Sequence, residues 1–467
     1  MGSANRFGTG LLGTFGLGLA GLMVYTLAFE GCRSNEGGSG AAAVSSEVAV
    51  FFPDRRDWSH FRHAVEVCVG RKLAKAVEDD GESVVVATPR HGRRVRFGWR
   101  GVRGVGETGD EVARSLATRP PPVAVVGSST SVLTVALAEA TREAGPSGPV
   151  LLIPWATALM AALPGQDRPV ALLEIDPGRT FRFCPDNRRL AESVVNCLID
   201  QGGGKSPRRA YVVVDPHDPY SIDLAGCFRA AIRARGSGVE VIDRPETLGV
   251  PSVNRLPGAP VVPSAEEVAL ADEAWSSAEG SGEGEATWVV LPLQGDPTRR
   301  MLAALRRRST WRGRVGSEGP IRVVCGDGVG RETLDALAGL RSFPIWCAST
   351  ASSRSPDHGV NNDTQALAEI ASALLLAVDL PPADRPVSAD AVRDALATLD
   401  LPATDARAFG RALAFEPDGE RRGDPGHVLA VRPGSPLVAE FARGPDGRWV
   451  QGPEPRSKSG PAKGARP

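Results

Sequence analysis

The sequence predicts an α/β fold of two Rossmann-like lobes, each a mainly parallel sheet flanked by helices. Four apolar runs rich in Val, Ile or Leu, at residues 123–126, 150–153, 210–214 and 321–324, end abruptly at polar or Gly-rich loops. Most of these loops lead into segments with helical spacing of apolar residues, an alternation typical of parallel sheets covered on both faces. The chain of 467 residues is also longer than one hydrophobic core usually supports, which predicts two lobes.

The N-terminal segment predicts export. Residues 8–29 carry no charge, follow Arg6 and are about long enough to cross a bilayer as a helix. We expect an uncleaved anchor, a cleaved or lipidated signal segment, or a plain hydrophobic tail. The residues Phe29 and Glu30 fit a lipoprotein signal at Cys32 poorly. Residues 32–47 are rich in Gly, Ser and Ala, which predicts a flexible tether ahead of the folded part.

From residue 48 onward, the hydrophobic pattern predicts strands and helices in alternation. Strands are expected at residues 48–52, 83–88, 123–126, 150–153, 210–214, 287–293 and 321–324. Helices are expected at residues 58–77, 109–117, 131–143, 186–204, 221–235, 361–378 and 388–399, and from Asp296. Asp186 and Asp296 are expected to cap their helices, and Pro297 stands in a first helical position.

Three stretches interrupt this alternation. The Gly- and Arg-rich residues up to 106 predict a hairpin or loop. Residues 245–285 hold several Pro, Gly, Ser and Glu residues with little periodicity, which predicts an insertion on the surface. Residues 411–434 predict two strands joined through a Gly-containing turn, and residues 452–467 predict a disordered tail.

The composition disfavours nucleic acid as a partner. The formal net charge is −1, the arginines are scattered, and aromatic residues make up only 5% of the chain. Proteins that bind nucleic acid concentrate positive charge on one face, and those that bind single strands add aromatic stacking platforms. We therefore expect no nucleic-acid partner.

The sequence predicts neither a metal site nor a cofactor. His60 and His63, and likewise Asp215, His217 and Asp218, have spacings that match no established metal site. Seven cysteines without a CxxC motif are expected mainly as small buried side chains, although a disulfide is compatible with export. They are Cys32, Cys68, Cys184, Cys197, Cys227, Cys325 and Cys347.

Five segments, in order, resemble the type I periplasmic-binding fold, in particular the substrate-binding proteins of branched-chain amino acid ABC transporters. They are the strand and Ser-rich loop GSSTS, the strand and loop PWATA, the crossing segment RTFRFCPDNRRLAESVV, the segment VVVDPHDPYSIDLAGCFRAAI, and the Gly-acid-Gly turn VVCGDGVG. The segment LAFEPDGERRG near the C-terminus resembles a further turn of that family. The resemblance covers roughly residues 48–451 and implies two lobes joined by a multi-segment hinge, with no enzymatic activity.

The resemblance also implies how the chain is divided. It places the anchor or signal segment and tether in residues 1–46, the first lobe in residues 47–172 and 345–405, and the second lobe in residues 173–344 and 406–451. Two loops depart from the family's pattern. The opening loop VAVFFPDRRDWSHF differs, and the aromatic residue often found after the strand at 287–293 is absent. Both departures concern loops expected to line the cleft.

The candidate ligand-binding residues lie in loops that follow predicted strands. They are Ser128, Ser129, Thr130, Ser131, Trp155, Ala156, Thr157, Tyr220 and Asp327. The serines and threonine at 128–131 begin a helix, where free N–H groups and the helix dipole favour an anion such as a carboxylate. The family resemblance implies that Asp327 receives an ammonium group and that Tyr220 closes over the ligand from the second lobe.

Each of these residues also has a purely structural interpretation. Ser and Thr at a helix start are ordinary caps, Asp327 between glycines is an ordinary turn residue, and Trp155 is compatible with core packing. The hypotheses are therefore a tethered extracytoplasmic protein that closes on an amino acid or similar solute and serves an ABC transporter permease or a membrane sensor, or an anchored interaction module that has lost solute binding. A hydrolase is the third, but GSSTS lacks the second Gly of the G-x-S-x-G motif, and only His427 offers a base.

Overall fold

The computed structural model describes most of the chain after residue 45. The described residues are 46–102, 104–161, 168–201, 206–236, 238–244, 262–279, 286–308, 320–329, 343–350, 364–423, 426–432, 438–444 and 446–452. None of the helices in these ranges is long and apolar enough to cross a membrane. The expected anchor at 8–29 lies outside the described residues, as do nearly all of the expected tether (32–47) and tail (452–467). Ser46 and Glu47, expected in the tether, are the first residues of β1.

The first sheet has seven strands with a parallel core. In spatial order they are β2 (Lys75–Asp79), β3 (Ser83–Ala87), β4 (Arg94–Gly101), β1 (Ser46–Phe52), β5 (Pro122–Gly127), β6 (Val150–Ile153) and β9 (Thr180–Arg182). The strands β4, β1, β5, β6 and β9 run parallel, while β2 and β3 form antiparallel pairs at one edge. The Gly- and Arg-rich segment expected as a hairpin or loop contains the strand β4, which pairs antiparallel with β3, the strand predicted at 83–88.

The second sheet has eight strands and also begins with parallel pairs. In spatial order they are β11 (Glu240–Arg244), β10 (Arg209–Val213), β12 (Thr287–Leu291), β13 (Ile321–Cys325), β14 (Ile345–Ser349), β17 (His427–Val431), β18 (Val438–Arg443) and β19 (Trp449–Gln451). The pairs from β11 to β14 are parallel and the rest antiparallel. Both sheets belong to one compact unit of the chain, Val44–Pro467.

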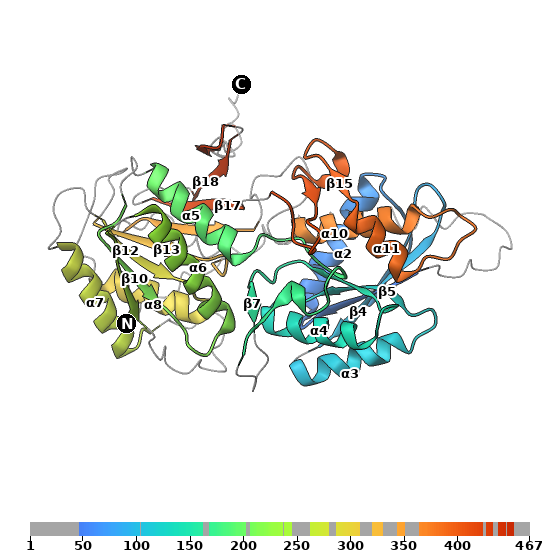
Figure 1. Ribbon diagram of the computed structural model, residues 1–467, viewed down its shortest axis with the longest axis horizontal. Coiled ribbons are helices and arrows are strands. Elements are labelled where there is room, and N and C mark those ends of the chain that lie inside the picture. The colour runs from blue at the N-terminus through green and yellow to red at the C-terminus, as the bar shows by residue number, and fades with distance from the viewer. Residues whose placement is uncertain are drawn as a thin grey trace, which may run out of the picture. The chain divides into compact units, whose positions relative to one another are not determined.

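Helices cover both faces of each sheet (Figure 1). The described helices are α2 (Arg55–Gly70), α3 (Val105–Leu116), α4 (Ser131–Glu143), α5 (Asn187–Gln201), α6 (Pro219–Arg235), α7 (Ala265–Glu279), α8 (Gly295–Arg308), α10 (Gln365–Asp379) and α11 (Ala389–Ala397). One apolar cluster joins the first sheet to α2, α10 and α11, and another joins its opposite face to α4. In the second sheet, α5 and α6 cover one face, and α7 and α8 the other.

Short elements complete the described structure. They are the strand pairs β7 (Met160–Ala161) with β8 (Val170–Ala171) and β15 (Asp400–Leu401) with β16 (Leu413–Ala414), and the 3-10 helices Leu172–Glu174 and Ala406–Ala408.

The chain passes between the two sheets more than once. The β9 strand lies in the first sheet, and the α5 helix that follows it packs on the second. The β14 strand lies in the second sheet, and the next described helix, α10, packs on the first. These passages agree with a multi-segment connection. The predicted boundaries differ from the structure at β9 and β14, because each pairs in the sheet other than the one expected. They also differ at residues 408–415, which were expected in the second lobe but pack against the first sheet.

Four other predictions were wrong. The helix α8 begins at Gly295, so Asp296 lies in its first turn and does not cap it. The helix expected at 58–77 ends at Gly70, where Lys72 takes a left-handed backbone conformation and the chain turns into β2. The expected insertion at 245–285 contains α7, whose Leu270 and Trp275 are buried against the second sheet. The strands within 411–434 do not pair with each other, because β16 pairs with β15 and β17 with β14 and β18.

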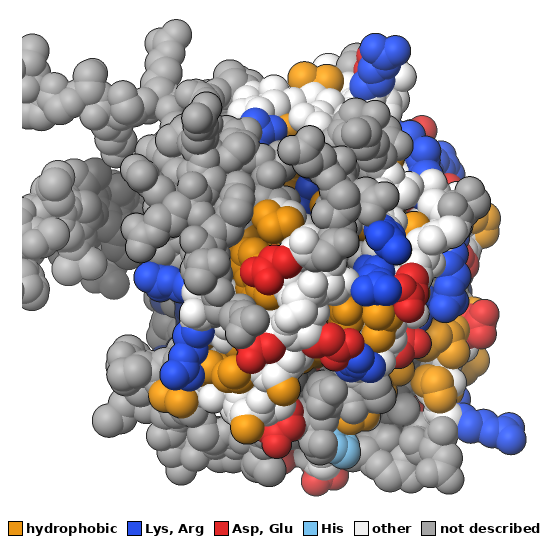
Figure 2. Space-filling model, turned by 90° about the vertical axis from the view of Figure 1, so that its left-hand side faces the viewer, with side chains coloured by type: hydrophobic (Ala, Val, Ile, Leu, Met, Phe, Trp, Pro, Cys, Tyr) orange, Lys and Arg blue, Asp and Glu red, His pale blue; other side chains and the backbone are white. Residues whose placement is uncertain are grey.

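The surface over the second sheet carries mixed charge. On the face shown in Figure 2, acidic and basic side chains are interspersed, with hydrophobic side chains in several small groups between them. A face of this kind does not concentrate charge of one sign.

Candidate functional site

The second sheet brings Tyr220 and Asp327 together. Tyr220 stands in the first turn of α6, where its N–H donates to the carboxylate of the capping residue Asp218 at 3.1 Å. Asp327 follows β13 by two residues. The Tyr220 hydroxyl donates to Asp327 Oδ1 at 2.5 Å. A Cβ atom on Gly326 would lie 2.5 Å from that hydroxyl, so glycine is needed for this close approach.

Burial sets the electrostatics of this pair, in which Tyr220 is buried and Asp327 is half-buried. Desolvation raises the pKa of the Tyr220 phenol well above its ordinary value, and the nearby Asp327 carboxylate raises it further. Desolvation also raises the pKa of Asp327, while the hydrogen bond from Tyr220 opposes that shift. Among the described residues, no Lys or Arg forms an ion pair with Asp327. A desolvated carboxylate without a cation beside it attracts a positively charged group strongly.

The predicted anion site at residues 128–131 uses several of its polar groups internally. Thr130 caps α4 by accepting from the Leu133 N–H at 3.4 Å. The buried Ser128 donates its N–H to Thr134 Oγ1 at 3.2 Å. The hydroxyl of Ser129 hydrogen-bonds the carboxyl group of Asp57, whose pKa is raised by burial despite that bond. Ser131, the first residue of α4, is also buried.

The loop after β6 is packed rather than open. The ring of Trp155 is partly buried and lies 5.4 Å from the ring of Phe52. Ala156 is buried in an apolar cluster of the first sheet, and Thr157 is also buried. The Thr157 carbonyl accepts from the Asn187 N–H at 2.7 Å, which ties this loop to the start of α5. In the described part of the chain, no hydrogen bond joins residues 128–131 or 155–157 to Tyr220 or Asp327.

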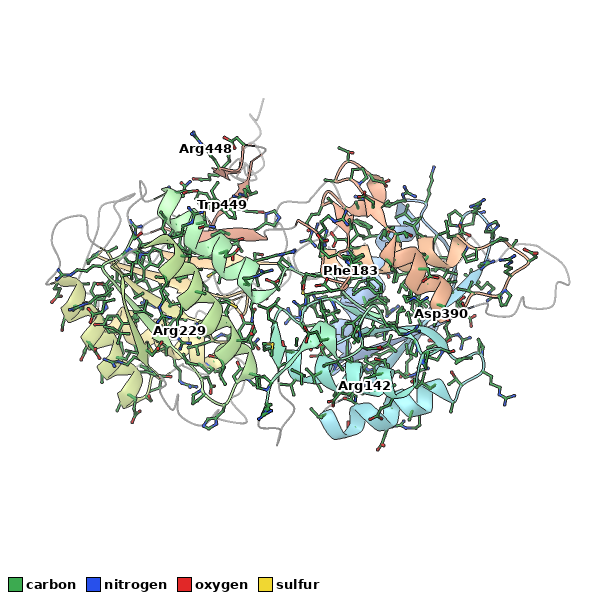
Figure 3. All side chains as sticks on the ribbon, viewed as in Figure 1. Arg142, Phe183, Arg229, Asp390, Arg448 and Trp449 are labelled. Carbon is green, nitrogen blue, oxygen red and sulfur yellow. The ribbon has the colours of Figure 1, made fainter. Side chains whose placement is uncertain are left out.

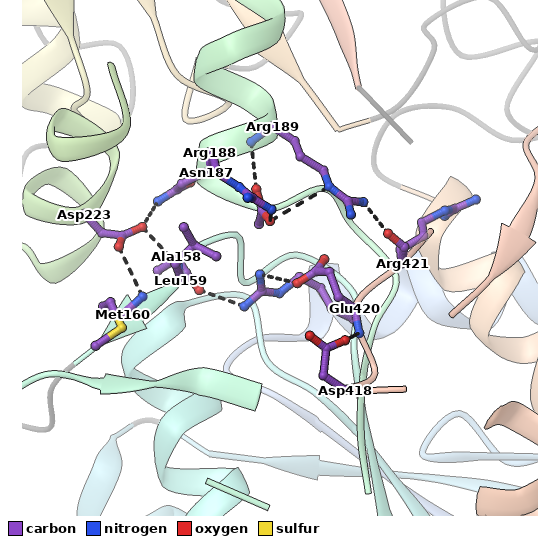
Figure 4. Close-up of polar contacts among 12 residues, drawn as sticks. Ala158, Leu159, Met160, Asn187, Arg188, Arg189, Asp223, Asp418, Glu420 and Arg421 are labelled. Carbon is purple, nitrogen blue, oxygen red and sulfur yellow. Dashed lines mark hydrogen bonds and ion pairs between the residues drawn. The ribbon is translucent and has the colours of Figure 1, made fainter. Parts of the chain in front are cut away.

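Asp223 makes a contact that the sequence analysis did not predict. Its carboxylate accepts from the N–H groups of Leu159 at 3.0 Å and Met160 at 3.1 Å, and from Asn187 Nδ2 at 2.8 Å. Figure 4 shows Asp223 on α6 directed at these groups. Asp223 lies three residues after Tyr220 and therefore on a neighbouring part of the same helix surface. The three-residue spacing from Tyr220 was the only feature of the sequence that could have indicated a role for Asp223.

A buried ion pair and an aromatic contact join the end of β9 to the segment around residues 415–421. Arg182, at the end of β9, pairs with Glu420 at 3.0 Å and donates to the Ala158 carbonyl at 2.8 Å. The next residue, Phe183, labelled in Figure 3, packs edge-on against Phe415 with ring centroids 5.0 Å apart. The segment around residues 415–421 is therefore fixed against the end of the first sheet.

The histidines considered for a metal site or a catalytic base make local contacts. No group of three His, Cys, Asp or Glu side chains among them could hold a metal ion. His63 lies 3.4 Å from Glu66 on one helix, and the His217 N–H donates to Asp215 in a local turn. His427, the base considered for the serine loop, lies at the start of β17, 3.4 Å from Glu440.

Two α/β lobes with polar residues after parallel strands define a class of ligand-binding architecture. No protein-family model matches the chain, and no curated protein matches its sequence. Many solved structures resemble the chain, among them three solute-binding proteins. The leucine-, isoleucine-, valine-, threonine- and alanine-binding protein of Brucella ovis, in a closed conformation, has a TM-score of 0.58 at 11% identity, covering 88% of this chain and 94% of that one.

The other two structures were solved with different ligands. The ABC transporter substrate-binding protein of Desulfitobacterium hafniense in complex with Leu has a TM-score of 0.55 at 15% identity, covering 87% and 99%. A solute-binding protein of an ABC transporter from Rhodopseudomonas palustris in complex with p-hydroxybenzoic acid has a TM-score of 0.54 at 14% identity, covering 87% and 95%. The chain therefore has the type I periplasmic-binding fold, as the sequence predicted, and these neighbours are solute-binding proteins rather than enzymes.

Proposed function

We propose that this chain is an extracytoplasmic solute-binding protein that closes its two lobes on an amino acid or a similarly small polar solute. The Tyr220–Asp327 pair is the observation that carries this proposal. The Asp327 carboxylate follows β13 and is partly desolvated, and the Tyr220 phenol lies at the start of α6. In folds of this type, ligands bind beyond the carboxyl ends of the parallel strands. The bilobed fold of the solute-binding neighbours supports the same function.

In the proposed complex, the two lobes recognise opposite ends of the solute. Asp327 accepts the ammonium group, and Tyr220 covers it from the second lobe. The N–H groups and hydroxyls at the start of α4, with the loop at Trp155, Ala156 and Thr157, receive the carboxylate. The closed protein then presents a joined surface to an ABC transporter permease or to a membrane sensor. Residues 8–29 anchor the protein to the membrane, or direct its secretion and are then cleaved.

The test is thermal unfolding of the full chain with single solutes. The panel contains leucine, isoleucine, p-hydroxybenzoate, small amides and sugars. A solute at a hundredfold excess over its dissociation constant stabilises the protein by about 2.7 kcal/mol. Asp327→Asn is expected to abolish the shift produced by an amino acid, because the amide retains a hydrogen-bond acceptor for Tyr220 but loses the charge.

Asp446→Asn is the matched control, since Asp446 lies in an exposed ion pair of the C-terminal strands. It is expected to leave the solute shift unchanged. An amino-acid shift that survives Asp327→Asn would contradict the role of Asp327. A shift confined to p-hydroxybenzoate would retain solute binding and change the ligand class.

The alternative, an anchored interaction or sensory module that has lost solute binding, rests on a specific observation. Ser128 and Thr130 hydrogen-bond within the protein, and Ser129 interacts with the carboxyl group of Asp57. A carboxylate there disfavours a second anion. If no solute of the panel stabilises the protein against thermal unfolding, this alternative is favoured.

A further inference from the structure

Cys325 and Cys347 lie opposite each other in the second sheet. Cys325 is the last residue of β13, Cys347 is in the middle of β14, and the register of this parallel pair aligns the two residues directly. Both are fully buried. Both belong to the apolar cluster beneath α7 and α8, so their side chains lie on the same face of the sheet.

This register meets the Cα-spacing requirement of a disulfide. Neighbouring strands are about 4.8 Å apart. A disulfide bridges Cα atoms that are about 4.4–6.8 Å apart. Both thiols are free in this structure, and the neighbouring Cys325 adds to the raised pKa of Cys347, after burial itself. The four other described cysteines lie elsewhere: the Cys68 thiol, for example, donates to the Ala368 carbonyl beneath the first sheet.

We propose that Cys325 and Cys347 form a disulfide in the exported protein. The inference rests on the export included in the proposed function, because such bonds persist in oxidising compartments. The oxidant is the disulfide of a thiol–disulfide exchange catalyst. One cysteine thiolate attacks that disulfide, forming a mixed disulfide and releasing one catalyst thiol. The second cysteine thiolate then displaces the other catalyst thiol and completes the new S–S bond.

Overall, two protein thiols lose two protons and two electrons, and the catalyst disulfide becomes a dithiol. Exchange precedes the packing of α7 and α8, because the folded protein buries both thiols. The completed bond links two functional segments. Cys325 lies two residues before Asp327, and Cys347 lies three residues before Thr350, whose carbonyl accepts from the Arg411 guanidinium at 2.5 Å. The disulfide therefore fixes the Asp327 turn against the strand that leads toward α10.

Peptide mapping of the full chain tests this bond directly. The protein is exported into an oxidising bacterial periplasm, denatured, alkylated with iodoacetamide without reductant, and digested. We expect peptides containing Cys325 and Cys347 to be joined, with a mass about 2 Da below the sum of the free peptides, since two hydrogens are lost. Peptides containing Cys68 and Cys197 should be alkylated. Alkylated Cys325 and Cys347 in the exported protein would overturn the proposal.

A second measurement links the bond to stability. Dithiothreitol should lower the Tm of the exported protein by several degrees, because the 325–347 loop is no longer closed in the unfolded chain. The double variant Cys325→Ala, Cys347→Val should have a Tm that does not respond to the reductant. The control double variant Cys68→Ala, Cys197→Ala should retain the response. If dithiothreitol still lowers the Tm of the variant without Cys325 and Cys347, the effect belongs to other cysteines and the proposal is overturned.

The mapping requires no solute, so its outcome is independent of ligand binding. A joined peptide pair in a protein that binds nothing from the panel would support the disulfide while the solute-binding proposal fails. If the Cys325 and Cys347 thiols are free in a protein that binds an amino acid, the disulfide proposal fails and the solute-binding proposal is supported.

Discussion

Asp327 is expected to lower the stability of the solute-free protein because its carboxylate is positioned to bind a cationic solute. Its carboxylate is desolvated, and the neighbouring Tyr220 hydroxyl supplies a hydrogen bond but no positive charge. Asp327 is half-buried, and partial removal from water favours the protonated form of a carboxyl group, which is why its pKa is raised. A cationic solute would relieve that penalty, so the free protein is expected to be less stable than it would be with a neutral residue at this position.

We therefore predict that Asp327→Asn stabilises the solute-free protein at neutral pH. Because the folded pKa is raised, the folded state binds this proton more tightly than the unfolded state does. The stability of the natural protein consequently falls as the pH rises from the ordinary carboxyl pKa through the raised one. The gain from the variant should approach about 1.4 kcal/mol for each unit by which the pKa is raised.

Urea denaturation of both proteins between pH 4 and pH 8 measures this difference. The difference in unfolding free energy should be largest at high pH and shrink as the pH falls, because protonated Asp327 is neutral like Asn. Other carboxyl groups titrate in both proteins and cancel in the comparison. A difference that does not change with pH, or that grows on acidification, would contradict the electrostatic explanation.

At the scale of elements, the start of α6 makes three different contacts. Asp218 caps the helix, Tyr220 reaches Asp327, and Asp223 binds N–H groups of the first sheet's loop. A shift of this helix along its axis would therefore change the proposed ligand contact and the inter-lobe contact together. This coupling makes α6 the element on which the relation between the lobes depends.

We predict that Asp223→Ala frees the N–H groups of Leu159 and Met160, because their only described acceptor is the removed carboxylate. Hydrogen exchange at these two amides should accelerate by roughly tenfold or more, a change equivalent to about 1.4 kcal/mol of local opening. Asp243→Ala is the control. Asp243 forms an exposed ion pair with Arg229 on the same lobe. Unchanged exchange at both amides in Asp223→Ala would exclude this contact as an inter-lobe constraint.

Local pattern predicted most elements well, and α4 and β6 have the predicted bounds. The failures have physical causes. In α7, Leu270, Ala274 and Trp275 have helical spacing, but the flanking Pro and Gly residues obscured it. The helix from residue 58 was predicted too long because Ala74 and Ala76 continue an apolar pattern through a turn and into an edge strand.

The site was less predictable than the fold. Tyr220 and Asp327 are separated by 107 positions, and their contact depends on the spatial order of β10, β12 and β13. No periodicity in the sequence encodes that order, so their association came from family resemblance. The Asp57 contact with Ser129 and the Asp223 contacts were missed for the same reason: each joins segments distant in the chain.

For the whole molecule, a buried cluster around Glu369 joins the segments that pass between the sheets. Glu369, in α10, pairs with Arg411 at 2.8 Å and Arg421 at 2.5 Å. Arg421 also donates to the carbonyl of Phe183, and Arg411 to that of Thr350, the residue after β14. All three charged side chains are buried, so each depends on the others for compensation of its charge.

We predict that Glu369→Gln lowers the free energy of unfolding by roughly 3–5 kcal/mol at neutral pH, because two guanidinium groups lose their shared carboxylate. Burial alone would raise the pKa of Glu369, but Arg411 and Arg421 outweigh it and hold the pKa below its ordinary value. A lowered folded pKa gives stability that is present above the unfolded pKa and is lost as the pH falls through the folded value.

Chemical denaturation at pH 7 and at successively lower pH distinguishes this ionic contribution from packing. The deficit of Glu369→Gln should shrink on acidification, because protonated Glu369 and Gln are both neutral. Asp394→Asn, which removes one partner of an exposed pair with Arg393, should have no measurable effect. A deficit that persists undiminished below the folded pKa would mean that shape, rather than charge, makes Glu369 necessary where the segments between the sheets converge.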